Sequence, residues 1–217
     1  MLNAWIDKRI RYVFVLPALI FVVVMMVFPI AYTLRLSFTK WSMASLRPPE
    51  WVGFSNYVSL LINDARFWGA VGRTFAFTII AVVVETILGV IIALVLNKET
   101  RGKNIIKTLF LLPMVATPVA VGMVWLLMYE PTIGVLNQLL TMMGLPAGLW
   151  LASPGQALGA LIIVDVWQWT PMITLIVLAG LAALPREPFE AAFVDGASLL
   201  QSIRLITLPL IQPTVVA

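Results

Sequence analysis

Long apolar runs constrain this chain more than any other feature of its sequence. A helix needs about 20 apolar residues at 1.5 Å rise per residue to cross a lipid bilayer. Four runs reach this length at residues 12–34, 74–96, 108–129 and 157–184, and a fifth begins near Leu205 and continues to Ala217. Strands of a membrane barrel instead alternate apolar and polar residues. The sequence therefore predicts an all-α, polytopic transmembrane bundle of four full helices and the start of a fifth.

The composition agrees with a lipid environment. The chain has 217 residues, of which 61% are hydrophobic and 11% are charged, whereas soluble domains are about half apolar and a quarter charged. It contains neither Cys nor His, which excludes disulfides, Cys/His zinc sites and His-based acid–base catalysis. The basic residues form short clusters beside apolar runs, so the net charge of +4 is a membrane signature and predicts no nucleic-acid partner.

Lys and Arg in the loops predict the orientation of the chain, because they are enriched on the cytoplasmic side. Nine of them lie before the first run, between the second and third, and after the fourth: Lys8, Arg9, Arg11, Lys98, Arg101, Lys103, Lys107, Arg186 and Arg204. The long loop after the first run holds five basic residues and weakens this bias, but residues 130–156 hold none. We expect a cytoplasmic N-terminus and a cytoplasmic segment 185–204.

Two carboxylates interrupt the apolar runs. Glu85 lies near the middle of the second run and Asp165 lies in the outer third of the fourth. A charge at the bilayer centre costs about 2.5–3.5 kcal/mol even on insertion scales. Both side chains are therefore expected to face the bundle interior, a partner or a water-filled cavity. For Glu85, a protonated or hydrogen-bonded packing role is favoured over a role in transport.

Asp165 shares one helical face with three other functional candidates, Gln168, Trp169 and Met172. A carboxylate and an amide can hydrogen-bond hydroxyl groups, and an indole can stack on C–H surfaces. This face is a candidate substrate path for hydroxyl-rich ligands. The alternative is an interfacial tryptophan belt with one interhelical hydrogen bond, and the sequence leaves both open.

Residues 185–204 form a polar, bent segment between two apolar runs. Pro185 ends the fourth run, and Pro188 fits the first turn of a new helix. Asp195 and Gly196 then break the pattern, with Asp195 expected to cap a second helix and Gly196 to supply the bend. The pattern predicts helix, bend and helix. Physical reasoning alone favours a connector and a docking element equally.

This segment resembles a known motif. The stretch "EAAFVDGASLLQSIRLITLPL", residues 190–210, is similar to the EAA loop in permease subunits of bacterial binding-protein-dependent ABC importers. The motif has E-A-A, a D-G-A turn and I-x-L-P, which match Glu190, Ala191, Ala192, Asp195, Gly196, Ala197, Ile206, Leu208 and Pro209. Residues 14–38, 96–113 and 165–192 resemble the sugar-uptake branch of this family, so the resemblance covers most of the chain.

The resemblance implies a function and a set of partners. It implies a multi-pass protein of the bacterial inner membrane that takes up sugars or related polyols. The expected partners are a second permease subunit, a cytoplasmic ATPase dimer and an extracytoplasmic solute-binding protein. In such families the EAA loop is a coupling helix in a groove of the ATPase. Glu190 would meet a basic ATPase surface, Ala191 and Ala192 would pack in the groove, and Gly196 would form the bend.

The sequence places ATP hydrolysis in another chain. It contains no G-x-x-x-x-G-K-[ST] motif, since its Gly102-Lys103 pair is followed by Asn104. We therefore expect no cofactor, metal site or catalytic residue in this chain, with ATP and Mg²⁺ bound by the partner ATPase. Family members have six helices, so residues 1–217 are expected to be an incomplete permease domain. The rival hypotheses are a structural membrane scaffold and an ion-coupled secondary transporter using Glu85 and Asp165.

Overall fold

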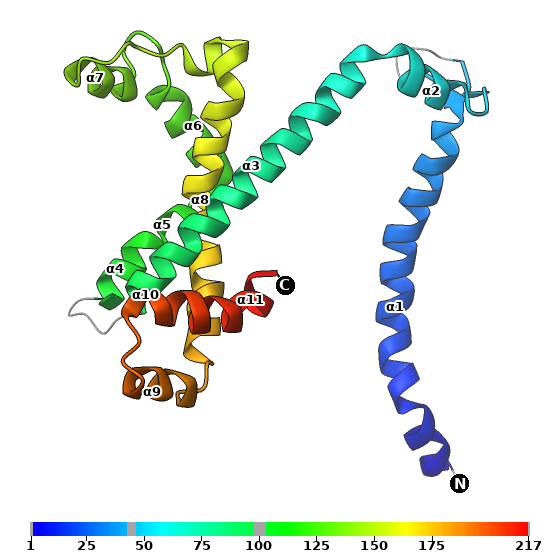
Figure 1. Ribbon diagram of the computed structural model, residues 1–217. Coiled ribbons are helices and arrows are strands. Elements are labelled where there is room, and N and C mark those ends of the chain that lie inside the picture. The colour runs from blue at the N-terminus through cyan, green and yellow to red at the C-terminus, as the bar shows by residue number, and fades with distance from the viewer. Residues whose placement is uncertain (1, 43–46, 98–102, 217) are drawn as a thin grey trace. The chain divides into compact units, whose positions relative to one another are not determined.

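The computed structural model describes residues 2–42, 47–97 and 103–216 (Figure 1). The chain divides into two compact units, Met1–Val71 and Gly72–Ala217. Three helices in the described residues are long and apolar enough to cross a membrane: Phe14–Ser37, Ala65–Leu96 and Pro154–Ala182. The predicted all-α class is confirmed, since the only strands in the described part of the chain are two of two residues each.

The first unit consists of one long helix and a short aromatic turn. Its elements are α1 (Leu2–Ser37), β1 (Thr39–Lys40), β2 (Glu50–Trp51), α2 (Ser55–Val58) and the π-helical turn η1 (Ser59–Asn63). Aromatic rings of Trp51, Phe54 and Tyr57 surround Phe38, with ring centroids 5.2–5.6 Å from it. The Ser37 and Tyr57 hydroxyls are 2.6 Å apart. These contacts fold the chain back on itself directly after α1.

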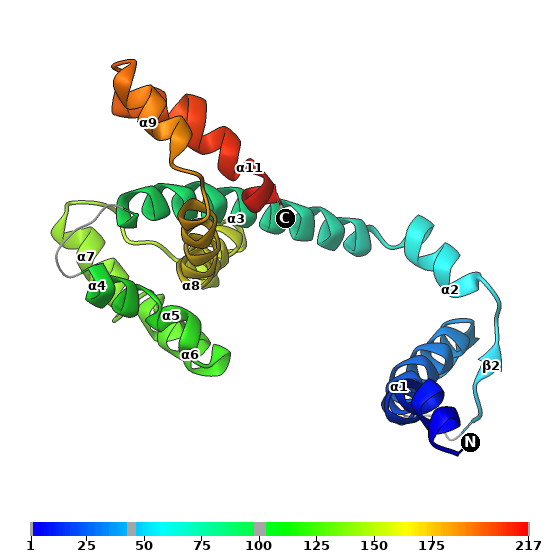
Figure 2. The same cartoon turned by 90° about the horizontal axis from the view of Figure 1, so that it is seen from below.

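The second unit contains the remaining helices, and α3 enters it from the first unit. In chain order they are α3 (Ala65–Leu96), α4 (Lys103–Phe110), α5 (Leu112–Val115), α6 (Pro118–Met128), α7 (Val135–Met142), η2 (Trp150–Ala152), α8 (Pro154–Ala182), α9 (Glu187–Val194), α10 (Leu199–Ser202), η3 (Ile203–Thr207) and α11 (Leu208–Val216). Helix α8 crosses α3, and α11 packs on α8 (Figures 1 and 2).

The third apolar run does not form the single helix predicted at 108–129. It is divided into α4, α5 and α6, and only α6 is both apolar and longer than two turns. Ala116 and Thr117 are extended, with ψ of 142° and 137°. A proline disfavours helical geometry in the preceding residue and lacks the N–H of a helical hydrogen bond, so Pro118 ends one helix and begins the next. The prediction of a single helix followed from the length of the apolar run and did not take this effect of Pro118 into account.

Small residues bring the helices of the second unit together. The buried core combines Ala93 and Leu96 of α3, Ile211 of α11, and three residues of α8: Val177, Leu178 and Leu181. A Cβ at Gly89 would lie 2.7 Å from Ile173 Cγ2 and 3.3 Å from the Thr174 backbone nitrogen. Gly89 therefore lets α3 approach the backbone of α8. In a bilayer such close van der Waals contact takes over much of the role of the hydrophobic effect.

We predict that Gly89→Ala loosens this contact. The added methyl group forces Ile173 or the α8 backbone to move, which costs about 1–3 kcal/mol in a packed interior. Thermal unfolding of the chain in lipid nanodiscs measures the loss. Gly159→Ala is the matched control, since nothing lies within 4 Å of a Cβ at Gly159. Equal unfolding temperatures for the two variants would contradict the contact.

Candidate functional site

The bent segment between α8 and α11 is built as two helices joined by a glycine. Helix α9 has Glu187 and Glu190 in its first turn, where carboxylates interact favourably with the helix dipole. Pro188 also lies in that turn, where its missing N–H costs nothing. The structure therefore shows the helix, bend and helix that the sequence predicts.

Gly196 forms the bend itself. Its φ is +72°, a left-handed conformation that glycine adopts without a Cβ penalty. The Gly196 N–H donates to the Phe193 carbonyl at 3.1 Å, and the Ala197 N–H donates to the Ala192 carbonyl at 2.9 Å. This pair of bonds is a Schellman motif, which satisfies the last carbonyls of α9.

The expected cap of the second helix was wrong. Asp195 is the C-terminal cap residue of α9, and Ser198 is the N-cap of α10. The Gln201 side chain accepts from the Ser198 N–H at 2.8 Å, while Ser198 Oγ accepts from the Gln201 N–H at 3.4 Å. A serine followed three residues later by glutamine is a capping box, so the signal was present in the sequence and overlooked.

The motif residues differ in how accessible they are. Glu190, Ala191, Asp195, Gly196 and Pro209 are exposed, whereas Ala192 is buried at 8% exposure. Ala192 lies four residues before Gly196; its side chain is turned into its own chain, and its carbonyl accepts the Ala197 N–H of the Schellman motif. Of the two adjacent alanines that follow Glu190, only Ala191 is exposed to another protein.

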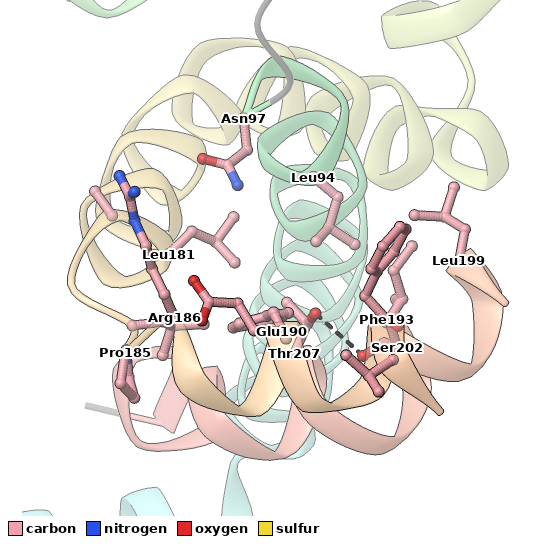
Figure 3. A pocket seen from close by; sticks show the side chains of 15 residues that line it. Leu94, Asn97, Leu181, Pro185, Arg186, Glu190, Phe193, Leu199, Ser202 and Thr207 are labelled. Carbon is pink, nitrogen blue, oxygen red and sulfur yellow. Dashed lines mark hydrogen bonds between the residues drawn. The ribbon is translucent and has the colours of Figure 1, made fainter. Parts of the chain in front are cut away.

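A cavity of about 820 Å³ lies beneath α9 (Figure 3). Asn97, Arg186 and Glu190 lie at one side of it, and Leu94, Phe193 and Leu199 lie at the other. The ends of α3 and α8 and the start of η3 complete its wall. The Thr207 hydroxyl donates to the Ser202 carbonyl at 3.2 Å across η3. The cavity is thus lined by both helices of the bend and by the ends of α3 and α8.

The bend carries exposed apolar side chains, and three of them, Phe193, Val194 and Leu199, also line the cavity. Phe193 and Val194 are 85% and 84% exposed, and Leu199 and Leu200 are 62% and 74% exposed. These residues flank Gly196 in the sequence and belong to no helix long enough to cross a membrane. Apolar residues gathered on a short polar segment indicate an interaction site. We call Glu190–Leu200 the docking surface.

The face proposed as a substrate path lies on α8. Asp165 and Gln168 are half-buried, while Trp169 and Met172 are each 41% exposed. Trp167 points elsewhere and makes an edge-to-face contact with Trp125 of α6, with ring centroids 5.5 Å apart. The four residues share a surface of α8, as helical spacing requires.

The two intramembrane carboxylates meet. Glu85 is only 6% exposed, as predicted for a charge inside the bundle, and its carboxyl interacts with that of Asp165 through both charge and a hydrogen bond. Glu85 Oε1 and Thr170 Oγ1 are buried without a hydrogen-bond partner among the described residues. The sequence singled out both carboxylates but gave no sign that α3 and α8 bring them together.

Sequence reasoning missed a polar anchor in the turn between α6 and α8. Asn137 is 5% exposed, and its Nδ2 donates to the carbonyls of Pro131 and Gly148 at 2.9 and 2.8 Å. Its Oδ1 accepts from the Gly148 N–H and from Trp150 Nε1. Trp150 has a φ of 47° and packs against Tyr129. A lone Asn in an apolar helix was the available signal.

The same turn holds a perturbed carboxylate. Glu130 accepts hydrogen bonds from the Thr132 hydroxyl and from the backbone N–H groups of Thr132 and Ile133, at 2.6–2.7 Å. The Thr132 hydroxyl, and after it the Ile133 N–H, hold the pKa of Glu130 below its ordinary value. At pH values above the ordinary pKa of a glutamate side chain, Glu130 is ionised and these bonds stabilise the start of the turn. They weaken as the pH falls through the lowered pKa of Glu130.

We predict that Gly196→Ala destabilises the bend by about 1–2 kcal/mol, because an L-residue is penalised in the left-handed conformation. Amide hydrogen exchange at Gly196 and Ala197, whose N–H groups close the Schellman motif, reports the change. Gly196→Asn is the control, because asparagine tolerates positive φ better than alanine. Faster exchange for Asn than for Ala would contradict this account.

A family model described as "Binding-protein-dependent transport system inner membrane component" matches residues 85–217. A probable ABC transporter permease, y4oQ of Sinorhizobium fredii, is 40% identical over 92% of this chain and 64% of its own length. The trehalose/maltose transport system permease MalF of Thermococcus litoralis is 34% identical over 97% and 70%. This chain thus spans about two thirds of the length of these curated relatives.

Solved structures show the same fold. One chain of a bacterial ABC transporter involved in import of the acidic polysaccharide alginate superimposes with a TM-score of 0.82 at 25% identity, covering 99% of this chain and 72% of that one. A chain of a bacterial alginate ABC transporter in complex with a pentasaccharide-bound periplasmic protein gives 0.83 at 24%, covering 97% and 70%.

Proposed function

This chain belongs to the family of inner membrane components of binding-protein-dependent transport systems, and from this membership we propose that it is a permease subunit of an ATP-driven importer for sugars or related polyols. The observation that carries the proposal is the family match over residues 85–217, which include the whole docking surface. Proteins of this family are permease components and not enzymes.

The substrate class rests on what related proteins are named for. Relatives of this chain are named as permeases for trehalose and maltose, for maltodextrin, and for sulfoquinovosyl glycerol. All of these solutes carry many hydroxyl groups. Asp165, Gln168, Trp169 and Met172 supply hydrogen-bonding and stacking groups for such a solute. We propose that this face of α8 lines the translocation path.

The docking surface is proposed to couple the permease to ATP hydrolysis. Glu190, at the wall of the cavity, and Ala191 are both exposed on α9, and a basic groove of a cytoplasmic ATPase dimer would contact them. Phe193 and Val194 would lose their exposure in the same contact. Asp195 and Gly196 form the turn, and Pro209 lies in the first turn of α11, the helix that would receive the motion. ATP and Mg²⁺ would be bound by the ATPase.

The remaining partners follow from the same proposal. With the N-terminus in the cytoplasm, the docking surface faces the cytoplasm too, and the turn at Asn137 faces the opposite side of the inner membrane. A solute-binding protein would deliver the sugar to that side. A second permease subunit would complete the path. ATP and the loaded binding protein would favour one of two conformations of the bundle, and hydrolysis would restore the other.

The coupling proposal is tested by reversing one charge. We expect Glu190→Lys in the assembled transporter to abolish ATP-driven uptake while membrane insertion stays normal, because a lysine would repel a basic groove. Uptake of labelled sugar and ATP hydrolysis are measured in proteoliposomes. Glu187→Lys is the matched control, since Glu187 is an exposed carboxylate of the same helix turn outside the motif.

Two outcomes would overturn the coupling proposal. One is unchanged uptake in Glu190→Lys. The other is uptake that stops when the proton gradient is collapsed while ATP is maintained, which would favour an ion-coupled transporter instead.

The substrate path is tested at Trp169. Loss of one aromatic stacking surface should raise the sugar concentration for half-maximal uptake by about 2- to 13-fold, since aromatic contacts are worth about 0.5–1.5 kcal/mol beyond their area. The variant is Trp169→Ala. Trp167→Ala removes the same side chain from the opposite surface, where it packs on Trp125, and should lower stability more than affinity. Equal affinities for both variants would place Trp169 outside the path.

A further inference from the structure

We infer that Glu85 and Asp165 form a proton-binding site inside the helix bundle, in which the two carboxyl groups share one proton and thereby join α3 to α8. Neither the family nor the proposed transport function requires such a site. It rests on where the two side chains lie and on what surrounds them.

The packing of the two helices brings the two carboxyl groups to neighbouring levels of the bundle, where their side chains interact. Gly89 of α3 contacts Ile173 and Thr174 of α8. Glu85 is one helical turn before Gly89, and Thr170 is one turn before Thr174, so these residues lie at the same level of the bundle. Asp165 lies one further turn along α8. A helical side chain leans toward its own N-terminus, which directs the long Glu85 side chain to the level of Asp165.

The surroundings leave Glu85 without another partner. Its side chain is 6% exposed, and Oε1 neither reaches solvent nor accepts a hydrogen bond from any described residue. Among the described residues, Thr170, 5% exposed, is the other buried side chain with an unpartnered oxygen. Two unsatisfied buried oxygens at one level of the bundle are uncommon, because each costs about 1–3 kcal/mol. A bound proton gives Glu85 a donor.

No basic side chain of the packed helices neutralises the pair. Helix α8 contains no Lys or Arg, and α3 contains only Arg66 and Arg73, the nearer of which is 12 residues and so ~18 Å along the helix from Glu85. Among the described elements that pack on α8, neither α5, α6 nor α11 contains a charged or titratable residue. Asp165 is therefore the one titratable group that faces Glu85 from these helices.

Electrostatics then decides the protonation of the pair. Two carboxylates in hydrogen-bonding contact repel each other strongly in a medium of low dielectric constant, so both are not ionised together. One shared proton replaces this repulsion with a short O–H···O⁻ hydrogen bond, which is about twice as strong as a neutral one. The proton belongs to the pair, and not to either residue.

A metal ion fits these residues less well than a proton. Calcium takes 6–8 oxygen ligands, and magnesium demands an octahedron of them. The described residues contain no group of three or more acidic, His or Cys side chains that could hold a metal. Two carboxyl groups and one hydroxyl satisfy a proton, which needs only a donor and an acceptor.

The site would act as a removable link between helices. With the proton bound, the pair holds α3 against α8 one turn before the Gly89 contact. With the proton lost, the two carboxylates repel each other at the same place. The link lies beside the buried Pro171, which interrupts the backbone hydrogen bonds of α8. Its protonation therefore biases the geometry of α8 at the level of Gln168 and Trp169.

Infrared spectroscopy tests the shared proton directly. The full chain is placed in lipid nanodiscs at pH 7, and the carbonyl stretch of a protonated carboxylic acid is recorded. We expect the band in the wild type and its loss in Glu85→Gln, whose amide keeps the shape and donates to Asp165 permanently. In Asp165→Asn the Glu85 acid loses its ionised partner, so its band should shift to the position of a weaker hydrogen bond. Glu50→Gln, which removes an exposed carboxylate outside both helices, should leave the band unchanged.

Each other result overturns the inference. A wild-type spectrum without the acid band would mean that both carboxylates are ionised, and a carboxylate band that moves when sodium replaces an organic cation would assign the site to a metal ion. A band that is unmoved in Asp165→Asn would assign the proton to Glu85 alone. These spectra do not depend on transport, so they distinguish failure of this inference from failure of the proposed function.

Discussion

The close contact of α3 with α8 is the interaction on which the second unit depends. Gly89 gives α3 access to the α8 backbone, and one turn later Ala93, 0% exposed, begins the core shared with Val177 and Ile211. Helix α11 enters the same core through Ile211 and approaches α8 again where Thr214 contacts Gly180. Because lipid drives helix association weakly, this unit relies on small residues that permit close packing.

That core also holds both ends of the docking surface. The surface follows α8 on one side and leads through η3 into α11 on the other, and both helices are fixed to the same buried cluster. The chain between them is short and is closed by local devices: the Schellman motif at Gly196 and the capping box of Ser198 and Gln201. In the proposed coupling to an ATPase, a force applied at α9 would therefore be carried into α8 and α11 together.

Polar groups inside the bundle are treated in two ways. Thr174 is 1% exposed and donates to the Thr170 carbonyl of its own helix, so its hydroxyl needs no hydrogen-bond partner from a neighbouring helix. Glu85 has no such local partner and depends on Asp165 from another helix. The Thr174 bond lies within one helix and does not change when helices move. The Glu85–Asp165 pair joins two helices, so in the inferred site its protonation depends on the distance between α3 and α8. Membrane interiors tolerate both because the alternative is an unsatisfied polar group in hydrocarbon.

The sequence by itself determined the all-α membrane class, since only helices satisfy the backbone of continuous apolar runs in lipid. It also determined the helix, bend and helix of residues 185–204, because Pro188 and Gly196 act through local backbone geometry. Two local predictions were wrong because two sequence signals competed. The apolar run hid the helix break at Thr117-Pro118, and Asp195 was chosen over Ser198 as the N-cap of the second helix. Only the tertiary structure decided that Glu85 meets Asp165, that Ala192 turns inward while Ala191 stays exposed, and that Asn137 anchors Trp150. Those outcomes depend on which helices meet and at what register, and no single helix encodes that.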